Sequence, residues 1–396
     1  MLAVVASLLF AGCRGGQPFF GPKPSKVPEP IVRVRIVGPA YTIPVSVSGP
    51  FTLAGFDGKT LFQGSGLPYT PIKTDGDVLC LGNKRIPIAD YCELIPGRNG
   101  ALAVNSTNYR GWLRLYRTTD GQLIGVNHVK IEDYLKGVLP GEMLPKFGLE
   151  TYKAQAIAAR TFALYEKYTA PGSKKWDVLA TEGSQMYPGL SAETEKSVRA
   201  VDATRGIVLT AELPGRGWKI FPTYYASACG GRTQAAVHLA NISPAIQPLR
   251  GNVVCRDCRP SRYYTWTNSV FTGQGLADAL NAKAAAPFTF KRVTALNILE
   301  RAQNCRITRI QVVDVTGRQV ILSGERFRLI VGSRNLPSTW CQLRRDGDNF
   351  VFYDGHGLGH GVGMCQYGAE GMTQRGYTAL EVLKHYYPTA KPTRAY

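Results

Sequence analysis

The chain has 396 residues, of which 44% are hydrophobic and 10% aromatic, a composition that supports a sizeable core and excludes a chain disordered throughout. Its formal net charge is +19 and its pI is about 9.6, which favours a polyanionic partner such as an acidic polymer or an anionic membrane surface. The basic residues are scattered and no zinc-finger, bZIP or RNA-recognition signature is present, so we expect no nucleic-acid partner.

The N-terminus resembles an export signal. MLAVVASLLFAGC contains an apolar run of about a dozen residues, which is too short to span a bilayer and is typical of a signal-peptide core. Small residues precede Cys13, as in a bacterial lipoprotein cleavage site, so we expect residues 1–13 to be a signal peptide and Cys13 to carry lipid. The alternative is a buried N-terminal strand or helix. Residues 14–30 are rich in Pro and Gly and predict a tether.

The next part of the chain is predicted to be all β. Residues 31–37, IVRVRIV, alternate apolar and basic side chains, which is the period of a half-buried strand. From there to about residue 127, short β-like runs are separated by turn sequences such as GFDGK and TTDGQ. GWLRLY and LIGVNHV flank the last of these turns and predict a hairpin. Cys80 and Cys92 bracket a short loop and could form a disulfide.

The period then changes to that of a helix. Apolar residues recur at intervals of three and four across residues 148–168, which predicts a helix of roughly twenty residues. SAETEKSVRAVDATRG predicts a second helix, with Ser191 and Thr194 as candidate caps and Gly206 as its stop.

Helices and strands are mixed in the rest of the chain. GIVLTAE, KIFPTYYASA, RITRIQVVDV and RFRLIVGS predict strands, whereas residues 272–285 and 378–387 predict helices. The chain shows no βαβ alternation and no phosphate-binding glycine motif. We therefore predict a mixed α+β fold.

Glu142 is a candidate general acid. It lies between apolar neighbours just before the alanine-rich helix, and apolar surroundings favour the acid form of a glutamate. Lys153, Gln155 and Arg160 lie on the helix that follows and could face the same cleft, since Lys153 and Arg160 are seven residues apart on one face. The alternative is that Glu142 only complements a helix dipole.

A glycine-rich stretch, residues 355–372, reads GHGLGHGVGMCQYGAEGM and contains no run that predicts an ordinary helix or strand. Dense glycine favours backbone that turns sharply or approaches another group closely. Flexible linkers combine Gly with Ser, so the His, Cys, Gln and Tyr found here indicate a binding surface instead. We expect His356 and His360 to contact a substrate rather than a metal, and His128 and His385 to be packed or surface residues.

Four cysteines predict a metal site. Cys255 and Cys258 form a C-x-x-C motif, Cys229 precedes two glycines, and Cys365 lies in the glycine-rich stretch. A C-x-x-C motif with further Cys or His ligands is typical of a tetrahedral structural zinc site. We expect Cys365 to be the fourth ligand, with His238 as the alternative. The competing interpretation is a disulfide that joins Cys255 either to Cys258 or to Cys229.

Three blocks carry a resemblance to a known family. The blocks IEDYLKGVLPGEM…KAQAIAARTFAL, SQMYPG…YYASACGGRT and GLGHGVGMCQYGAEGMTQRGYTALEVLKHYYP together resemble the SpoIID/LytB family of bacterial cell-wall proteins, in the family's order. The resemblance covers about residues 109–388 and is looser before them. The strand patterns thus predict a β-rich N-terminal region, residues 31–108, and the resemblance implies that a SpoIID-like α+β catalytic domain, residues 109–388, follows it.

The resemblance implies an exported peptidoglycan lytic transglycosylase. The lipid expected on Cys13 would hold it at a membrane, facing the cell wall or periplasm. Glu142 falls on the glutamate that SpoIID-type enzymes use as catalytic acid. The cysteines at CGG, CxxC and GMCQ resemble the variants that bind zinc. Members of another branch enhance an amidase, so the alternative function is a non-catalytic wall-binding enhancer of an N-acetylmuramoyl-L-alanine amidase, which would then be a partner.

A single glutamate suits this chemistry. Ordinary glycosidases need two carboxylates, whereas a lytic transglycosylase uses the C6 hydroxyl of the muramic acid as nucleophile and forms a 1,6-anhydro ring. One residue can protonate the leaving oxygen and then accept the hydroxyl proton. The positive net charge fits a wall polymer that bears carboxylates. The residues expected to contact the substrate are Lys153, Gln155, Arg160, Tyr187, His360, Gln366 and Tyr367.

Overall fold

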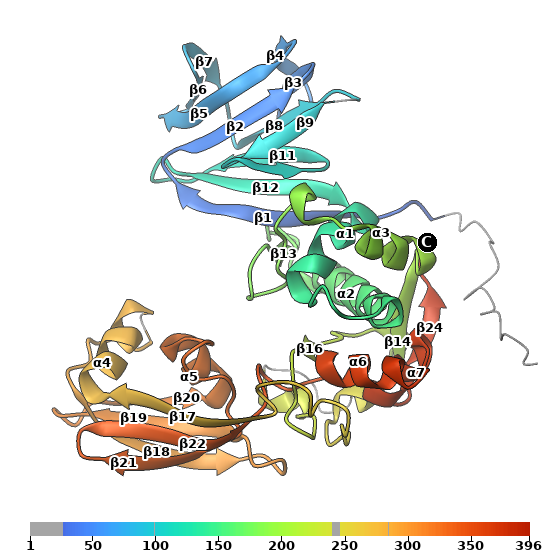
Figure 1. Ribbon diagram of the computed structural model, residues 1–396. Coiled ribbons are helices and arrows are strands. Elements are labelled where there is room, and N and C mark those ends of the chain that lie inside the picture. The colour runs from blue at the N-terminus through green and yellow to red at the C-terminus, as the bar shows by residue number, and fades with distance from the viewer. Residues whose placement is uncertain (1–26, 99, 240–245, 284) are drawn as a thin grey trace, which may run out of the picture.

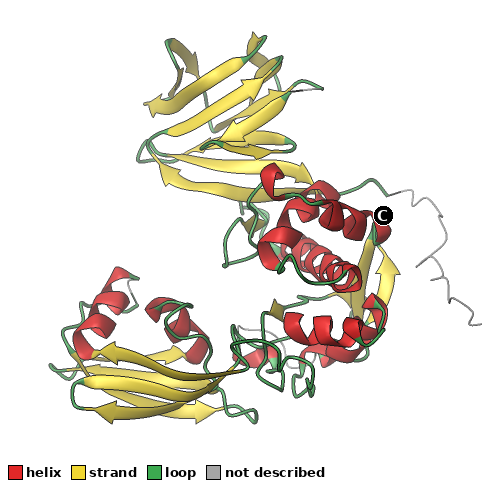
Figure 2. Cartoon of the chain, in the orientation of Figure 1, coloured by secondary structure: helices red, strands yellow, loops and turns green. Residues whose placement is uncertain are grey.

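The computed structural model describes residues 27–98, 100–239, 246–283 and 285–396 (Figure 1). The expected signal peptide, Cys13 and most of the expected tether lie outside these ranges. The described chain forms an N-terminal β module, a helical core and a second α+β module, and Figure 2 shows strands gathered in the two outer modules. The predicted mixed α+β fold is confirmed. In the described ranges, no helix combines the length and the apolar character that crossing a membrane requires.

The N-terminal β module consists of two packed sheets. One has the strand order β13-β1-β12-β11-β8-β3-β4 and the other β10-β9-β2-β5-β6-β7. Buried side chains from both sheets, such as Val45, Leu53 and Leu113, share one hydrophobic cluster. The strands are β1 (Ile31–Ala40), β2 (Ile43–Ser48), β3 (Phe51–Gly55), β4 (Thr60–Gly64), β5 (Leu67–Asp75), β6 (Val78–Leu81), β7 (Lys84–Pro87), β8 (Tyr91–Pro96), β9 (Ala101–Val104), β10 (Thr107–Tyr109), β11 (Trp112–Arg117), β12 (Leu123–Lys130) and β13 (Val178–Leu179).

The period-two patterns of this module are confirmed. Val32 and Val34 of β1 are fully buried while Ile31, Arg33 and Arg35 are partly exposed, as the alternation predicts. The predicted hairpin is the antiparallel pair β11–β12. The predicted disulfide is wrong: Cys80 and Cys92 are free thiols on strands of different sheets. β11 and β12 lie in the middle of the larger sheet, so this module continues past residue 108.

The helical core is built around α2 (Leu149–Thr169), which confirms the predicted long helix. Small buried residues such as Ala154, Ala158 and Ala159 let neighbouring elements pack against several sides of α2. The other elements of the core are α1 (Ile131–Glu142), the 3₁₀ turn η1 (Leu190–Ala192), α3 (Glu195–Ala203), β14 (Ile207–Leu213), β15 (Gly217–Ile220), β16 (Tyr225–Ala226), the 3₁₀ turns η2 (Ala236–His238) and η3 (Gln247–Leu249), β23 (Met364–Cys365), α6 (Gln366–Gln374), α7 (Ala379–Tyr386) and β24 (Lys391–Arg394).

The predicted end signals of α3 are largely confirmed. The Thr194 side chain caps the helix by accepting from the backbone N–H of Ser197, and the Ser197 side chain bonds back in a capping box. Ser191, the other candidate cap, lies in η1 instead. The predicted strand GIVLTAE is β14, and the predicted final helix is α7. KIFPTYYASA gives two short strands rather than one, because Pro222 between them has no N–H for a strand ladder.

The second α+β module, here called the inserted module, spans Thr265 to His356 within the core sequence. It has two three-stranded sheets, β17-β22-β21 and β18-β19-β20, covered by α4 and α5 around a separate hydrophobic cluster (Figure 1). Its elements are β17 (Thr265–Thr272), α4 (Gly273–Ala282), β18 (Val293–Arg301), β19 (Ile307–Asp314), β20 (Gln319–Ser323), α5 (Gly324–Val331), β21 (Gln342–Asp346) and β22 (Asn349–His356).

The segment RFRLIVGS is helical, so its prediction as a strand is wrong. Ser323 caps α5 by accepting from the backbone N–H of Arg326 at 3.2 Å. Phe327, Arg328 and Val331 are buried along one side at helical spacing. A short apolar run such as FRLIV fits either element, and the N-terminal cap decides between them.

Candidate active site and metal centre

A pocket of about 760 Å³ lies between the helical core and the inserted module. The core contributes Glu142, Phe147 and Tyr225 to its lining, and the inserted module contributes residues of α5 and of the loop that follows it. Residues of all three blocks that carry the family resemblance therefore line this pocket. They face the inserted module, which lies between the second and third blocks in the sequence.

Glu142 is the last residue of α1, and two glycines on that helix determine what it contacts. Gly137 and Gly141 are one turn apart and face the segment 185–189. A Cβ at Gly141 would lie 2.8 Å from the carbonyl oxygen of Met186, and one at Gly137 would lie 2.9 Å from the Tyr187 ring. Because both positions are glycine, the segment comes close enough for the Met186 N–H to donate to Glu142 Oε1 at 2.6 Å.

The surroundings of Glu142 favour its acid form. Burial raises the pKa of its carboxyl from 4.5 to about 7, the Met186 N–H lowers it, and the nearby negative charge of Glu182 raises it. At neutral pH a large fraction of Glu142 therefore carries the proton that a general acid must donate.

A buried hydrogen-bond network holds the segment that carries Met186. Tyr134 Oη donates to Gln185 Oε1 at 3.1 Å, and Gln185 Nε2 donates to Tyr225 Oη at 3.0 Å and to the carbonyl oxygen of Ala159 at 3.2 Å. Gln185 and Tyr225 were not predicted as site residues. Both lie in the second block of the family resemblance, and that block is the sequence feature that could have identified them.

His360 lines the pocket, as expected for a substrate-contacting residue. Its Nδ1 accepts from the backbone N–H of Val362 at 3.0 Å, which leaves the proton on Nε2 in the neutral ring. Burial lowers the pKa of His360 to about 4, so it is neutral at pH 7. His356 is not in the lining and packs against Trp340 with ring centroids 4.9 Å apart.

Gln366 and Tyr367 also line the pocket. Gln366 Nε2 donates to the backbone oxygen of Glu142 at 3.1 Å and so ties the end of α1 to the start of α6. The Tyr367 ring meets Phe147 edge-on at 5.2 Å between centroids. The third block thus contacts both the backbone and the surroundings of Glu142.

The four other residues expected to contact substrate do not line the pocket. Arg160 is fully buried, with an ion pair to Glu132 at 2.7 Å, so the prediction for it is wrong. Gln155 is also fully buried, and Tyr187 is buried against two other tyrosine rings, which corrects both predictions. Lys153 pairs with Glu150 at 2.6 Å. Neighbouring elements cover most of α2, so the spacing of seven residues did not identify an exposed face.

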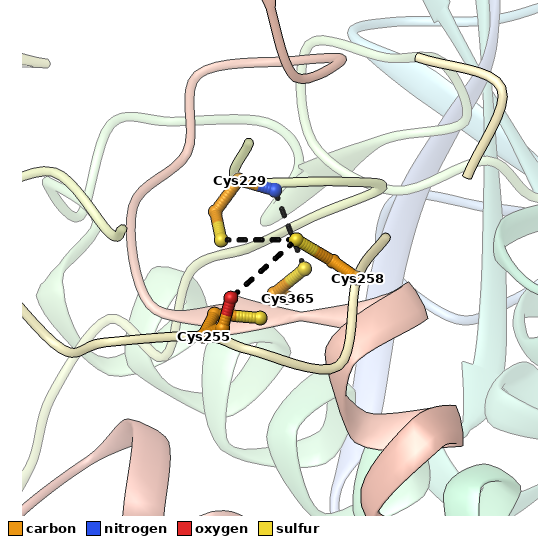
Figure 3. A group of neighbouring side chains, drawn as sticks. All are labelled: Cys229, Cys255, Cys258 and Cys365. Carbon is orange, nitrogen blue, oxygen red and sulfur yellow. Dashed lines mark hydrogen bonds between the residues drawn. The ribbon is translucent and has the colours of Figure 1, made fainter. Parts of the chain in front are cut away.

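Cys229, Cys255, Cys258 and Cys365 form a buried four-cysteine cluster (Figure 3). Their sulfurs all lie within 4.8 Å of one another, and those of Cys229 and Cys258 are 3.8 Å apart. Four thiolates around one zinc ion at ~2.3 Å would be spaced ~3.8 Å apart. All four are free thiols, so the structure does not contain the alternative disulfide. The cluster could therefore hold a metal ion.

Glycines allow the segments of the cluster to meet. Cys365 caps α6 by accepting from the Gly368 N–H at 3.4 Å, and a Cβ at Gly368 would lie 2.4 Å from Cys255 Sγ. The expectation that the glycine-rich stretch contains no helix is wrong, because tertiary packing of α6 outweighs the low helix propensity of its glycines. The cluster is completed by Cys365 and not by His238, which lies on η2.

Two family models match parts of this chain. Residues 119–210 match the family model for SpoIID, a stage II sporulation protein, and residues 252–363 match a domain of unknown function, DUF8618. An uncharacterized protein of Brachyspira hyodysenteriae is 30% identical over 358 residues, covering 90% of this chain and 91% of that protein.

Two relatives from Bacillus subtilis have descriptive names. Stage II sporulation protein D is 26% identical over 287 residues, covering 69% of this chain and 76% of that protein. The amidase enhancer is 24% identical over 295 residues, covering 64% of this chain and 39% of that protein. On the family model and these relatives together, the chain belongs to the SpoIID family.

Proposed function

We propose that the protein is a peptidoglycan lytic transglycosylase that cleaves the bond between MurNAc and GlcNAc and leaves 1,6-anhydro-MurNAc ends. The observation that carries the proposal is the Glu142 carboxyl, whose pKa is raised to about 7 at the wall of a pocket of about 760 Å³. Membership of the SpoIID family supports the same assignment.

Glu142 would act twice in this reaction. As the acid it donates its proton to the glycosidic oxygen, and as the carboxylate it then accepts the proton of the MurNAc C6 hydroxyl as that oxygen attacks C1. The nucleophile belongs to the substrate, so no second carboxylate is needed to activate water. Met186 orients the Glu142 carboxyl from one side through the 2.6 Å hydrogen bond.

The other two glutamates of the pocket are already engaged. Arg328 binds both oxygens of Glu325, at 2.7 and 2.8 Å. Glu182 is exposed and accepts from Ser333 Oγ at 3.1 Å, a contact that joins the core to the inserted module. Glu142 is therefore the pocket carboxyl that we assign to proton transfer.

We also propose that the four-cysteine cluster holds one structural zinc ion. Its four buried thiols come from three separate segments, and a tetrahedral set of four sulfur ligands is typical of structural zinc. Four protein ligands leave no open position for water, so the ion would stabilise the chain next to the pocket and take no part in proton transfer.

The alternative is a non-catalytic wall-binding enhancer of an N-acetylmuramoyl-L-alanine amidase, as the name of one relative suggests. Digestion of purified peptidoglycan followed by mass spectrometry separates the two functions. The enzyme alone should release fragments with 1,6-anhydro ends, which are lighter by one water than hydrolysis products. An enhancer would release nothing alone and would accelerate an added amidase.

Replacing Glu182 with Gln should shift the pH dependence of cleavage. A general acid must be protonated, so kcat/KM should fall as pH rises through about 7, the pKa of Glu142. Because the Glu182 carboxylate raises that pKa, its neutral replacement should move the fall to lower pH. Rates measured on solubilised glycan from pH 5 to 9 would check this. If kcat/KM falls over the same pH range in both proteins, Glu182 does not raise the pKa of the titrating group.

We further propose that the protein is exported and held at a membrane through lipid on Cys13, from where it acts on the wall. Feeding cells an alkyne fatty acid should label the wild-type protein and not Cys13→Ser. The variant should also leave the membrane fraction. Equal labelling of the two proteins would rule out Cys13 as the lipid site.

A further inference from the structure

One fully buried arginine forms no ion pair with a carboxylate of the described residues. Arg306 lies directly before β19 in the inserted module and is 0% exposed. Its Nη2 donates to the carbonyl oxygen of Cys229 at 2.9 Å and its Nη1 donates to that of Gly359 at 3.1 Å. Its Nε has no hydrogen-bond partner among the described residues.

Two other buried arginines show the usual arrangement. Arg160 pairs with Glu132, and Arg328 pairs with Glu325, both at 2.7 Å. Removing a cation from water is strongly unfavourable unless an anion compensates for it, and a guanidinium stays protonated in a protein. In the described part of the chain no ion pair involves Arg306, so its charge calls for a different anion.

The four-cysteine cluster can supply that anion. Arg306 contacts the backbone of Cys229, and this contact places the guanidinium next to the cluster. Four thiolates around a divalent ion carry a net charge of minus two, since four charges of minus one meet one of plus two. We propose that Arg306 is the charge-compensating residue of this metal centre, supplied by the inserted module to a cluster built from the core. The inference rests on the metal site proposed above.

The glycine-rich stretch is shaped around this guanidinium. A Cβ at Gly361 would lie 2.5 Å from Arg306 Nη2, and a Cβ at Gly357 would lie 3.1 Å from the same atom. Both positions flank Gly359, whose carbonyl oxygen accepts from Arg306, and His360 of the pocket follows directly. Arg306 thereby also positions the backbone that carries His360, next to the metal centre.

The test is the zinc affinity of three variants, measured by competition with a chromophoric chelator at fixed pH and salt. Arg306→Met removes the charge and should weaken zinc binding about tenfold or more. Arg306→Lys keeps the charge but loses the two-pronged contact with the carbonyl oxygens, and should bind zinc within about threefold of the wild type. Arg309→Met is the matched control, because Arg309 is exposed on the same strand, and should bind as the wild type does.

Wild-type affinity in a folded Arg306→Met protein would overturn the proposal. So would Arg306→Lys binding as weakly as Arg306→Met, since Arg306 would then act only by holding carbonyl groups. If Arg306→Met does not fold, Arg306→Lys decides alone: a loss of about tenfold overturns the proposal, and near-normal affinity supports it. A wild-type protein that binds no zinc removes the metal site itself. Glycan cleavage is assayed separately, so each failure is distinguishable.

Discussion

Glu142→Gln should abolish glycan cleavage, with a loss of about a thousandfold or more in kcat, while the protein stays folded and still binds glycan. The amide keeps the shape of the side chain and an oxygen that can accept from the Met186 N–H, but it has no proton to transfer. Turnover would be measured from the fragments released by purified peptidoglycan, and binding from sedimentation with insoluble peptidoglycan.

The matched control is Glu166→Gln. Burial also raises the pKa of Glu166, but this residue lies outside the pocket, so its replacement should leave cleavage unchanged. Near-normal turnover by Glu142→Gln would place the active site elsewhere in the molecule.

Glu142→Gln should also change how the stability of the protein depends on pH. The pKa of Glu142 is raised from 4.5 to about 7 on folding, so the folded state binds this proton more tightly than the unfolded state does. The stability from this group is fully present below pH 4.5 and is lost as pH rises to about 7. Glu142→Gln lacks this loss. The melting temperature of the variant minus that of the wild type should therefore increase as pH rises from 4.5 to about 7. A constant difference would show that the pKa is not raised.

Removing the metal should have the second large effect, a fall in melting temperature of about 10 °C or more. The four cysteines come from three segments, and Cys365 is more than a hundred residues from the other three in sequence, so an ion bound by all four contributes directly to folding. Chelation and Cys258→Ala should both produce this fall, and elemental analysis should find about one zinc per wild-type chain. Cleavage should decline only as the fold loosens.

Cys341→Ala is the control for this experiment. Cys341 is as buried as the cluster cysteines and is also a free thiol, but it lies outside the cluster. Its replacement should leave the zinc content unchanged. A wild-type protein without metal, in which mass spectrometry finds Cys255 oxidised to Cys258, would establish the disulfide instead.

Several features were predictable from the sequence because local patterns determine them. The alternation in β1 and the period of α2 follow from the side-chain geometry of a strand and a helix. Thr194 could be recognised as a cap because it needs only the next turn of chain. Glu142 was identifiable because its apolar neighbours are adjacent in sequence, and the grouping of four cysteines followed from known ligand patterns and the family resemblance.

Tertiary structure alone decided which of these residues share a site. The helical period places Arg160 on a defined face of α2. It does not show that Glu132 and neighbouring elements cover that face. The glycine-rich stretch contains both an irregular segment and α6, because its glycines are required where Arg306 and Cys255 approach the backbone, and both lie far away in sequence. Cys365 rather than His238 completes the cluster for the same reason: the fourth ligand depends on which segments pack together, and packing between distant segments leaves no periodic signal in the chain.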